Sequence, residues 1–279
     1  MTSLPDNAIT IRSLSTQAEL DACVALQYET WGRDFKDAVP ASILQVNQKI
    51  GGVSAGAFDS KGELVGFVFG MTGVENGAIV QWSDMLAVRP DARGQGIGRR
   101  LKEFQRKEVA RIGGTVIYWT FDPLVARNAH LNFNVLGVRA VEYVKDMYGK
   151  HTGSDLHRGI GTDRLVVAWD VKDDHLATRK LETMSARKRF WNAAKVIGDA
   201  ERRETRTKDW VKDGIMLALA VPEDIAEIQA ANAELASKWR TETRAAFQTA
   251  LDGGYVIAGF ATDKKPPRGY YLLSKPTTH

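Results

Sequence analysis

Three glycines and an arginine form a short turn between an apolar strand and a helix, with the spacing Arg93-x-x-Gly96-x-Gly98. Glycines allow backbone N–H groups to point into a concavity without clashes from Cβ atoms. A helix that starts at this turn adds unpaired N–H groups and the positive end of its dipole. The turn therefore predicts an anion-binding loop suited to a pyrophosphate.

The spacing excludes two other phosphate loops. No Gly-Lys-Ser/Thr follows, as a Walker loop requires, and the first glycine of a dinucleotide fingerprint is missing. With Ala78–Val88 as the strand and Gly98–Ile112 as the helix, the motif resembles the acyl-CoA loop of the GNAT superfamily of N-acyltransferases. A glycine-rich turn that binds nothing is the alternative interpretation.

The resemblance implies an enzyme that moves an acetyl or succinyl-like group from an acyl-CoA to an amine. The expected donor is acetyl-CoA or another acyl-CoA, and the amine attacks the thioester directly. The expected acceptor is a small-molecule amine, with amino acids as candidates. Two alternatives stay open: a protein or peptide N-acetyltransferase, and a CoA-binding module without catalysis.

The resemblance also assigns residues to the cofactor. The strand backbone at Leu86, Ala87 and Val88 would hold the pantetheine and the thioester carbonyl. The pyrophosphate would lie on backbone amides, with added charge from Arg93, and those amides belong to Gly94, Gln95, Gly96, Ile97, Gly98 and Arg99. Asn128 would hydrogen-bond the cofactor arm.

Asp84 is the candidate general base or ammonium anchor. It stands two residues before Leu86, which places both on one face of a regular strand. An acidic residue within an apolar strand is costly unless it is paired or used. A structural salt bridge is the competing role, and Glu75 in the preceding loop is the reserve base.

The general-acid position departs from the family. Many members carry a tyrosine that protonates the leaving thiolate, and alignment on Leu136-Gly137-Val138 puts Phe133 there. Phenylalanine cannot donate a proton. Tyr143 and Tyr148 on the next strand are the candidate replacements; otherwise the thiolate leaves unprotonated.

Aromatic and basic residues of the first helices and the strand ends could line an acceptor pocket. Arg33 could pair with a carboxylate, and each tryptophan could instead be a core residue. The candidates are Tyr28, Trp31, Arg33, Trp82 and Trp119. No metal site is predicted, because the five histidines do not fall at ligand spacings.

Hydrophobic periodicity predicts an α/β (α+β) chain whose element order matches the GNAT fold over about residues 8–171. The expected domains are a GNAT acyltransferase domain (1–171), a charged helical connector (172–213) and a small α/β segment (214–279). The last segment reads β-α-α-β-β and resembles the front part of a GNAT domain. Gly51-Gly52 before Phe58 is echoed by Gly253-Gly254 before Phe260.

Composition limits the compartment and the partners. The 279-residue chain has one cysteine, so no internal disulfide can form. No run approaches the roughly 18–20 apolar residues of a membrane span, and the N-terminus does not read as a signal peptide. The net charge of +4 is concentrated in the connector, so no nucleic-acid partner is expected. We expect a cytoplasmic monomer or homodimer without a membrane partner.

Overall fold

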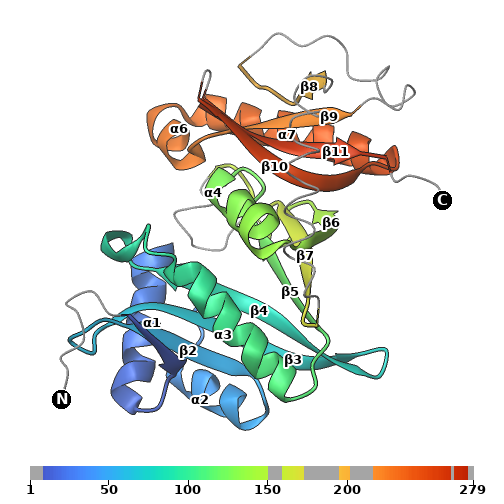
Figure 1. The fold of residues 1–279 in the computed structure, drawn as a ribbon. Helices are drawn as coiled ribbons and strands as arrows, with labels where there is room; N and C mark the ends of the chain where they lie inside the picture. The colour runs from blue at the N-terminus through green and yellow to red at the C-terminus, as the bar shows by residue number, and fades with distance from the viewer. Residues whose placement is uncertain (1–8, 150–158, 173–194, 202–215, 265–266, 276–279) are drawn as a thin grey trace. The chain divides into compact units, whose positions relative to one another are not determined.

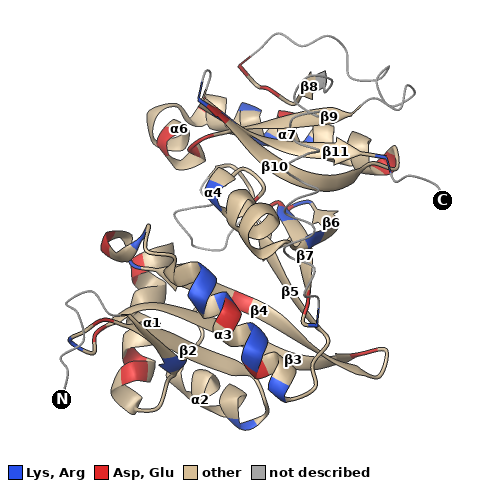
Figure 2. Ribbon diagram, viewed as in Figure 1, with Lys and Arg blue, Asp and Glu red and all other residues tan. Residues whose placement is uncertain are grey.

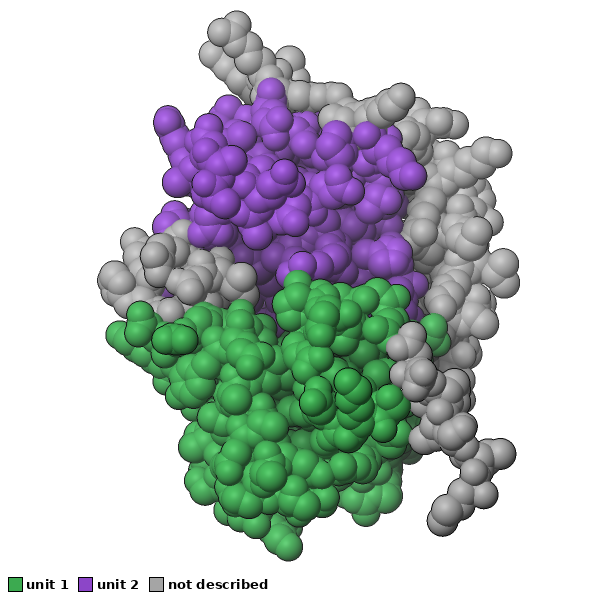
Figure 3. All heavy atoms as spheres, turned by 90° about the vertical axis from the view of Figure 1, so that its left-hand side faces the viewer, with its two compact units in different colours: residues 1–119, 151–156, 168–173 green, residues 120–150, 157–167, 174–279 purple. Residues whose placement is uncertain are grey.

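The computed structural model describes residues 9–149, 159–172, 195–201, 216–264 and 267–275. The chain divides into two compact units (Figure 3). Unit 1 comprises residues 1–119, 151–156 and 168–173, and unit 2 comprises residues 120–150, 157–167 and 174–279. Residues 120–150, expected within the acyltransferase domain, thus share a unit with the C-terminal residues. The expected domain boundaries stay predictions that fragment expression would check.

Unit 1 is built on antiparallel strands with helices packed against them (Figure 1). Its elements are β1 (Thr10–Ser13), α1 (Gln17–Trp31), α2 (Ala41–Lys49), β2 (Val53–Phe58), β3 (Leu64–Glu75), β4 (Ala78–Val88), the 3₁₀ turn η1 (Pro90–Ala92) and α3 (Ile97–Arg111). The large sheet has the order β1-β2-β3-β4-β5-β7-β6, with β5 (Val116–Phe121), β6 (Arg139–Val144) and β7 (Arg164–Asp170). This mixed α/β sheet confirms the predicted fold class.

Two apolar clusters hold the helices of unit 1. Phe67, Phe69 and Met85 pack with buried residues of α1 and α2. Val68 and Leu86 instead belong to the cluster that contains the α3 residues Ile97 and Leu101. Neighbouring strand residues therefore face opposite helices, as the period of two requires. Helix α1 begins after Thr16, which forms a capping box with Glu19.

Unit 2 contains a second, four-stranded sheet with the order β10-β11-β9-β8. Its elements are α4 (Ala126–Ala129), the π-helical turn η2 (His130–Leu136), β8 (Lys195–Ile197), β9 (Leu217–Pro222), α6 (Ile225–Ala231), α7 (Ala233–Asp252), β10 (Val256–Lys264) and β11 (Pro267–Ser274). The predicted β-α-α-β-β order is confirmed. The pairing differs from the front of unit 1, because β9 pairs with β11, the second strand of its hairpin, whereas β1 pairs with β2, the first.

Pro222 ends β9, and the helix after it begins at Ile225 behind the Asp224 cap. One expectation for the C-terminal half needs correction. The connector was expected to be helical, but Lys195–Ile197 is a strand that pairs with β9. Residues 173–194 and 202–215 of that connector lie outside the described residues.

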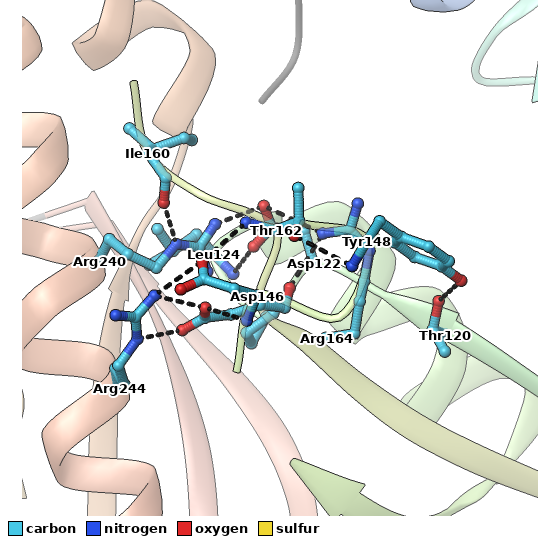
Figure 4. Close-up of polar contacts among 12 residues, drawn as sticks. Thr120, Asp122, Leu124, Asp146, Tyr148, Ile160, Thr162, Arg164, Arg240 and Arg244 are labelled. Carbon is cyan, nitrogen blue, oxygen red and sulfur yellow. Dashed lines mark hydrogen bonds and ion pairs between the residues drawn. The ribbon is translucent and has the colours of Figure 1, made fainter. Parts of the chain in front are cut away.

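An ionic cluster joins α7 to the residues around the end of β5 (Figure 4). Arg240 donates to Asp122 at 2.6 Å and to the carbonyl of Ile160 at 2.8 Å. Arg244 reaches Asp163 at 2.6 Å and Asp146 at 3.2 Å. The carboxylates are thus matched by arginines of α7. Trp239, next to Arg240, is fully buried in the core of unit 2.

Candidate active site

The anion-binding loop, residues 93–98, lies at the start of α3, and its first four residues are exposed. Gly94 and Gly96 have φ values of +83° and +72°, a region in which L side chains are strained. Open space surrounds both positions, because a Cβ built there would meet no atom within 4 Å. Gly96 caps α3 without a side-chain hydrogen bond, and the first turn carries no acidic residue. The first amides of α3 therefore have no side-chain cap at Gly96, and the dipole favours an anion there.

The arginines around this loop already have partners. Arg93 donates to the carbonyl of Val88 at 3.2 Å, and Arg99 pairs with Glu103 at 2.7 Å. Arg100 donates to the carbonyl of Ile9 at 2.6 Å. Figure 2 shows basic and acidic residues interspersed along α3. The backbone amides and the helix dipole are thus the part of the loop most open to an anion.

The strands β4 and β5 separate halfway along β4. Their parallel ladder runs from Val80–Val116 to Trp82–Tyr118 and stops there, although β4 continues to Val88. The predicted pantetheine contacts at Leu86, Ala87 and Val88 lie on the continuing part, which pairs with β3 on its other edge. The edge toward β5 is therefore available to an extended ligand with amide groups. We call the point after Trp82 and Tyr118 the fork.

A β-bulge at Asp84 changes the direction of the side chains at the fork. The register between β3 and β4 shifts between Phe69 and Gly70. Phe69 pairs with Met85 and Gly70 pairs with Ser83, so Asp84 between them has no partner on β3. Met85 joins the cluster of α1 and α2, whereas Leu86 joins that of α3. The expectation that Asp84 and Leu86 share a face is therefore wrong, because a bulge breaks the period of two.

The environment of Asp84 suits a base. Its side chain is exposed, and its carboxylate lies near Asp37 from the segment between α1 and α2 and near the Trp82 indole. Burial by neighbouring atoms raises the pKa of Asp84, repulsion by Asp37 raises it further, and the Trp82 hydrogen bond opposes both. No cation contributes to this balance within the described part of the chain. A structural salt bridge to Asp84 is thus not found among the described residues.

The predicted acceptor residues separate into three kinds. Trp82 is the one that contacts Asp84, while Tyr28 and Arg33 are exposed on α1 and just after it. Trp31 stacks on Phe35 at 5.4 Å between ring centroids and packs against the core of α1 and α2. Trp119 is buried against Trp169 and under Lys102, on the α3 side. Trp119 therefore takes the core role that the sequence left open.

The candidate acids and the cofactor residue Asn128 lie in unit 2. Tyr143 donates a short hydrogen bond to Asp163 and stacks on Phe247. Burial, and to a lesser extent the Asp163 carboxylate, raises the pKa of Tyr143 far above the ordinary value. Tyr148 is partly exposed, with its hydroxyl 3.0 Å from that of Thr120. Asn128 is half-buried in α4. Tyr143 is thus held in a structural contact, and Tyr148 is the more accessible of the two hydroxyls.

Phe133 has a structural explanation in unit 2. Its ring packs edge-on against Phe121 at 6.2 Å and against Tyr271 of β11 at 5.9 Å. Tyr271 in turn donates to the carbonyl of Pro123 at 2.7 Å. The position where the family carries a tyrosine is therefore an apolar contact with the C-terminal sheet, which a hydroxyl without a partner would disturb.

One buried polar residue at the fork escaped the sequence analysis. Lys102 of α3 donates to Ser83 at 2.7 Å, and its Nζ lies 3.7 Å from the centroid of the Trp119 ring. The signal was a polar alternation, Gln81 and Ser83, inside an apolar strand. Elsewhere, Glu75 accepts a hydrogen bond from Tyr118 at 2.8 Å. The described residues hold no group of His, Cys, Asp and Glu suited to a metal, and none of their helices is long and apolar enough to span a membrane.

Comparisons with solved structures find chains that are similar to this one. The chain is similar to an aminoglycoside 6'-acetyltransferase type Ii (22% identity, TM-score 0.46, 59% of this chain and 98% of that chain). It is similar to an aminoglycoside 6'-N-acetyltransferase complexed with coenzyme A (18% identity, TM-score 0.44, 59% and 98%). A chain of the NatC complex bound to Gag peptide and CoA is also similar (15% identity, TM-score 0.45, 58% and 98%).

The sequence comparisons match one part of the chain. No curated protein matches the chain. A family model described as an acetyltransferase (GNAT) domain matches residues 54–133. The matched segment contains β4, the anion-binding loop and α3, so this part of the chain is similar to a GNAT acetyltransferase domain.

Proposed function

We propose that this N-acetyltransferase transfers the acyl group of acetyl-CoA, or of a close acyl-CoA, to the amine of a small molecule, with amino acids among the acceptors. The observation that carries this proposal is that three features suited to acyl transfer occur together on β4 and the loop that follows it. The anion-binding loop opens at the start of α3, the edge of β4 is unpaired beyond the fork, and a bulge presents Asp84 beside Trp82.

The residues present fit the donor. Gly94 and Gly96 adopt left-handed backbone conformations with open space around them, and a Cβ atom at either position would narrow that space. The first amides of α3, which have no side-chain cap, lie next to this cradle. Bound there, the acyl-CoA supplies an activated thioester. The open edge of β4 offers the backbone groups of Leu86 and Val88 to an arm that carries amides of its own. The cradle holds the phosphates, and the strand edge orients the thioester.

Asp84 is proposed to take the proton of the acceptor ammonium. A base with a raised pKa binds that proton more readily than an ordinary aspartate does. The Trp82 indole lies beside the carboxylate, and Asp37 adds a second negative charge that favours a cationic acceptor. Arg33 lies exposed near the same segment and is the candidate partner for the carboxylate of an amino acid.

The test is an acceptor screen with the full chain. Acetyl-CoA is incubated with a panel of small amines and amino acids, and in parallel with a panel of peptides, and the released CoA thiol is measured. Thiol release with small amines supports the proposal. Release with peptides alone would give the protein N-acetyltransferase reading instead. CoA binding without thiol release in either panel would favour a binding module that has lost catalysis.

A further inference from the structure

Lys102 is a buried amine at the fork. The residue is 2% exposed, and it reaches from α3 to Ser83 of β4 and over the Trp119 ring of β5. Ser83 and Trp119 are the first residues beyond the last pair of the β4–β5 ladder. Lys102 therefore lies at the point where the two strands separate.

A directional chain of hydrogen bonds starts at this amine. Ser83 donates to Gln105 at 2.9 Å, and Gln105 donates to Gln81 at 2.6 Å. The Gln81 amide then donates to Thr72 at 3.4 Å, and Thr72 donates to the carbonyl of Gly51 at 2.7 Å. Because the Ser83 proton is given to Gln105, Lys102 must be the donor to Ser83. The chain fixes the position of the amine without taking its charge.

The charge of Lys102 has no counterion in the described part of the chain. Burial lowers the pKa of Lys102 well below the ordinary value, and no carboxylate opposes this effect. Among the described residues, the Trp119 ring face and the accepting Ser83 oxygen favour the cation. A buried cation without a counterion costs several kcal/mol, and such groups are concentrated at functional sites.

The anion-binding loop and Lys102 lie along one path. Lys102 stands five residues after Ile97, about 7.5 Å along the axis of α3. Ser83 stands five residues before Val88, about 17 Å along β4. An arm that leaves the loop and follows the open edge of β4 thus approaches the fork with its far end. For an acyl-CoA, that end carries the thioester.

We propose that Lys102 stabilises and protonates the sulfur that leaves during acyl transfer, an inference that rests on the proposed function. The acceptor ammonium first loses one proton to Asp84. The free amine then forms the new C–N bond, the C–S bond breaks, and its electron pair stays on sulfur. The nitrogen releases its second proton to water, and the Lys102 ammonium gives one proton to the thiolate, which leaves as the thiol. Lys102 would thus be the general acid in place of the tyrosine that many family members carry at the position of Phe133.

The test measures the thiol of bound CoA rather than turnover. The full chain is saturated with CoA, and the ultraviolet absorbance of the thiolate is followed as the pH rises. A cation beside the sulfur should lower the thiol pKa by about 1–3 pH units relative to CoA in solution. Lys102→Gln, which keeps a donor to Ser83, should remove most of that change. Lys107→Met, at an exposed lysine of the same helix, should leave it intact.

The wild-type measurement alone can overturn the inference, whatever the variant does to folding. A bound thiol that titrates like CoA in solution would exclude Lys102 from the sulfur while leaving the proposed function intact. Failure of CoA to bind at all would overturn both. Acylation of Lys102 on incubation with acetyl-CoA alone, detected by mass spectrometry, would make it an acceptor and contradict the role of proton donor.

Discussion

The ionic cluster of unit 2 and the fork of unit 1 differ in how their charges are paired. In unit 2, Asp122, Asp163 and Asp146 are matched by arginines, two of which come from α7. In unit 1, the exposed Asp84 and the buried Lys102 have no opposite charge among the described residues.

This difference separates charged residues that stabilise the fold from charged residues that are candidates for catalysis. An ion pair with its hydrogen bonds satisfied fixes one arrangement of the chain. Asp163 is an example: burial raises its pKa, but the hydrogen bonds from Arg244 and Tyr143 outweigh burial, so that the pKa is lowered overall. A charge left uncompensated is costly and marks a candidate functional group. Substitutions in unit 2 should therefore act on stability, and those at Asp84 and Lys102 on catalysis.

The largest expected effect comes from Asp84. Asp84→Asn keeps the shape and the Trp82 contact but removes the proton acceptor. We expect turnover to fall by about 10²–10⁴-fold with CoA affinity unchanged, the range for loss of a general base. Steady-state kinetics and calorimetric CoA titration check both halves. Asp91→Asn, at an exposed aspartate of η1, is the control, and equal turnover in the two variants would return Asp84 to a structural role.

A paired charge in unit 2 should give a stability effect without a catalytic one. Arg240→Met leaves Asp122 buried, with Arg164 remaining 3.9 Å away. Breaking a buried pair costs about 3–5 kcal/mol, and the remaining arginine places the expected loss near the lower limit, about 3 kcal/mol. Denaturant unfolding measures it, and Arg111→Met, which breaks the exposed pair with Glu108, should cost at most about 0.5 kcal/mol. Similar losses in both variants would refute the distinction.

The smallest expected effect concerns a compensated charge at the surface of unit 1. The hydrogen bond from Arg12 lowers the pKa of Glu19 to about 2, from an ordinary 4.5. Because the folded-state pKa is depressed, the stabilisation is present above pH 4.5 and is lost as the pH falls toward 2. Discounted for solvent and including the capping box, it is about 1 kcal/mol. Glu19→Gln should therefore match wild type at the acid end and be less stable at pH 7, as measured by unfolding at both pH values.

The sequence predicts the local features well and the distant contacts poorly. The glycine spacing predicted the loop before α3, because such a turn depends on neighbouring residues. The bulge at Asp84 was not predictable, since it arises from the register with β3. Likewise, Phe133 could not be explained until Tyr271, 138 positions further along, was found against it.

The site shows the same limit. The backbone positions at Leu86–Val88 follow from the motif, whereas Lys102 looked like an ordinary helix lysine. Its burial depends on Trp119 and Ser83 meeting over it, which requires the fork. The charged connector also misled, because part of it adds a strand to the second sheet, and pairing with β9 outweighs helical composition.

The binding of CoA to the loop of residues 93–98 is the central claim, and calorimetric titration of two glycine variants tests it most directly. Gly96→Val and Gly62→Val both place a β-branched residue at a positive φ with open space around it, so both carry similar strain. Gly62 lies in the turn between β2 and β3, away from the loop. We predict that folded Gly96→Val loses CoA affinity by at least about 100-fold, roughly 2.7 kcal/mol, while Gly62→Val binds like wild type. Unchanged CoA affinity in folded Gly96→Val would contradict the account.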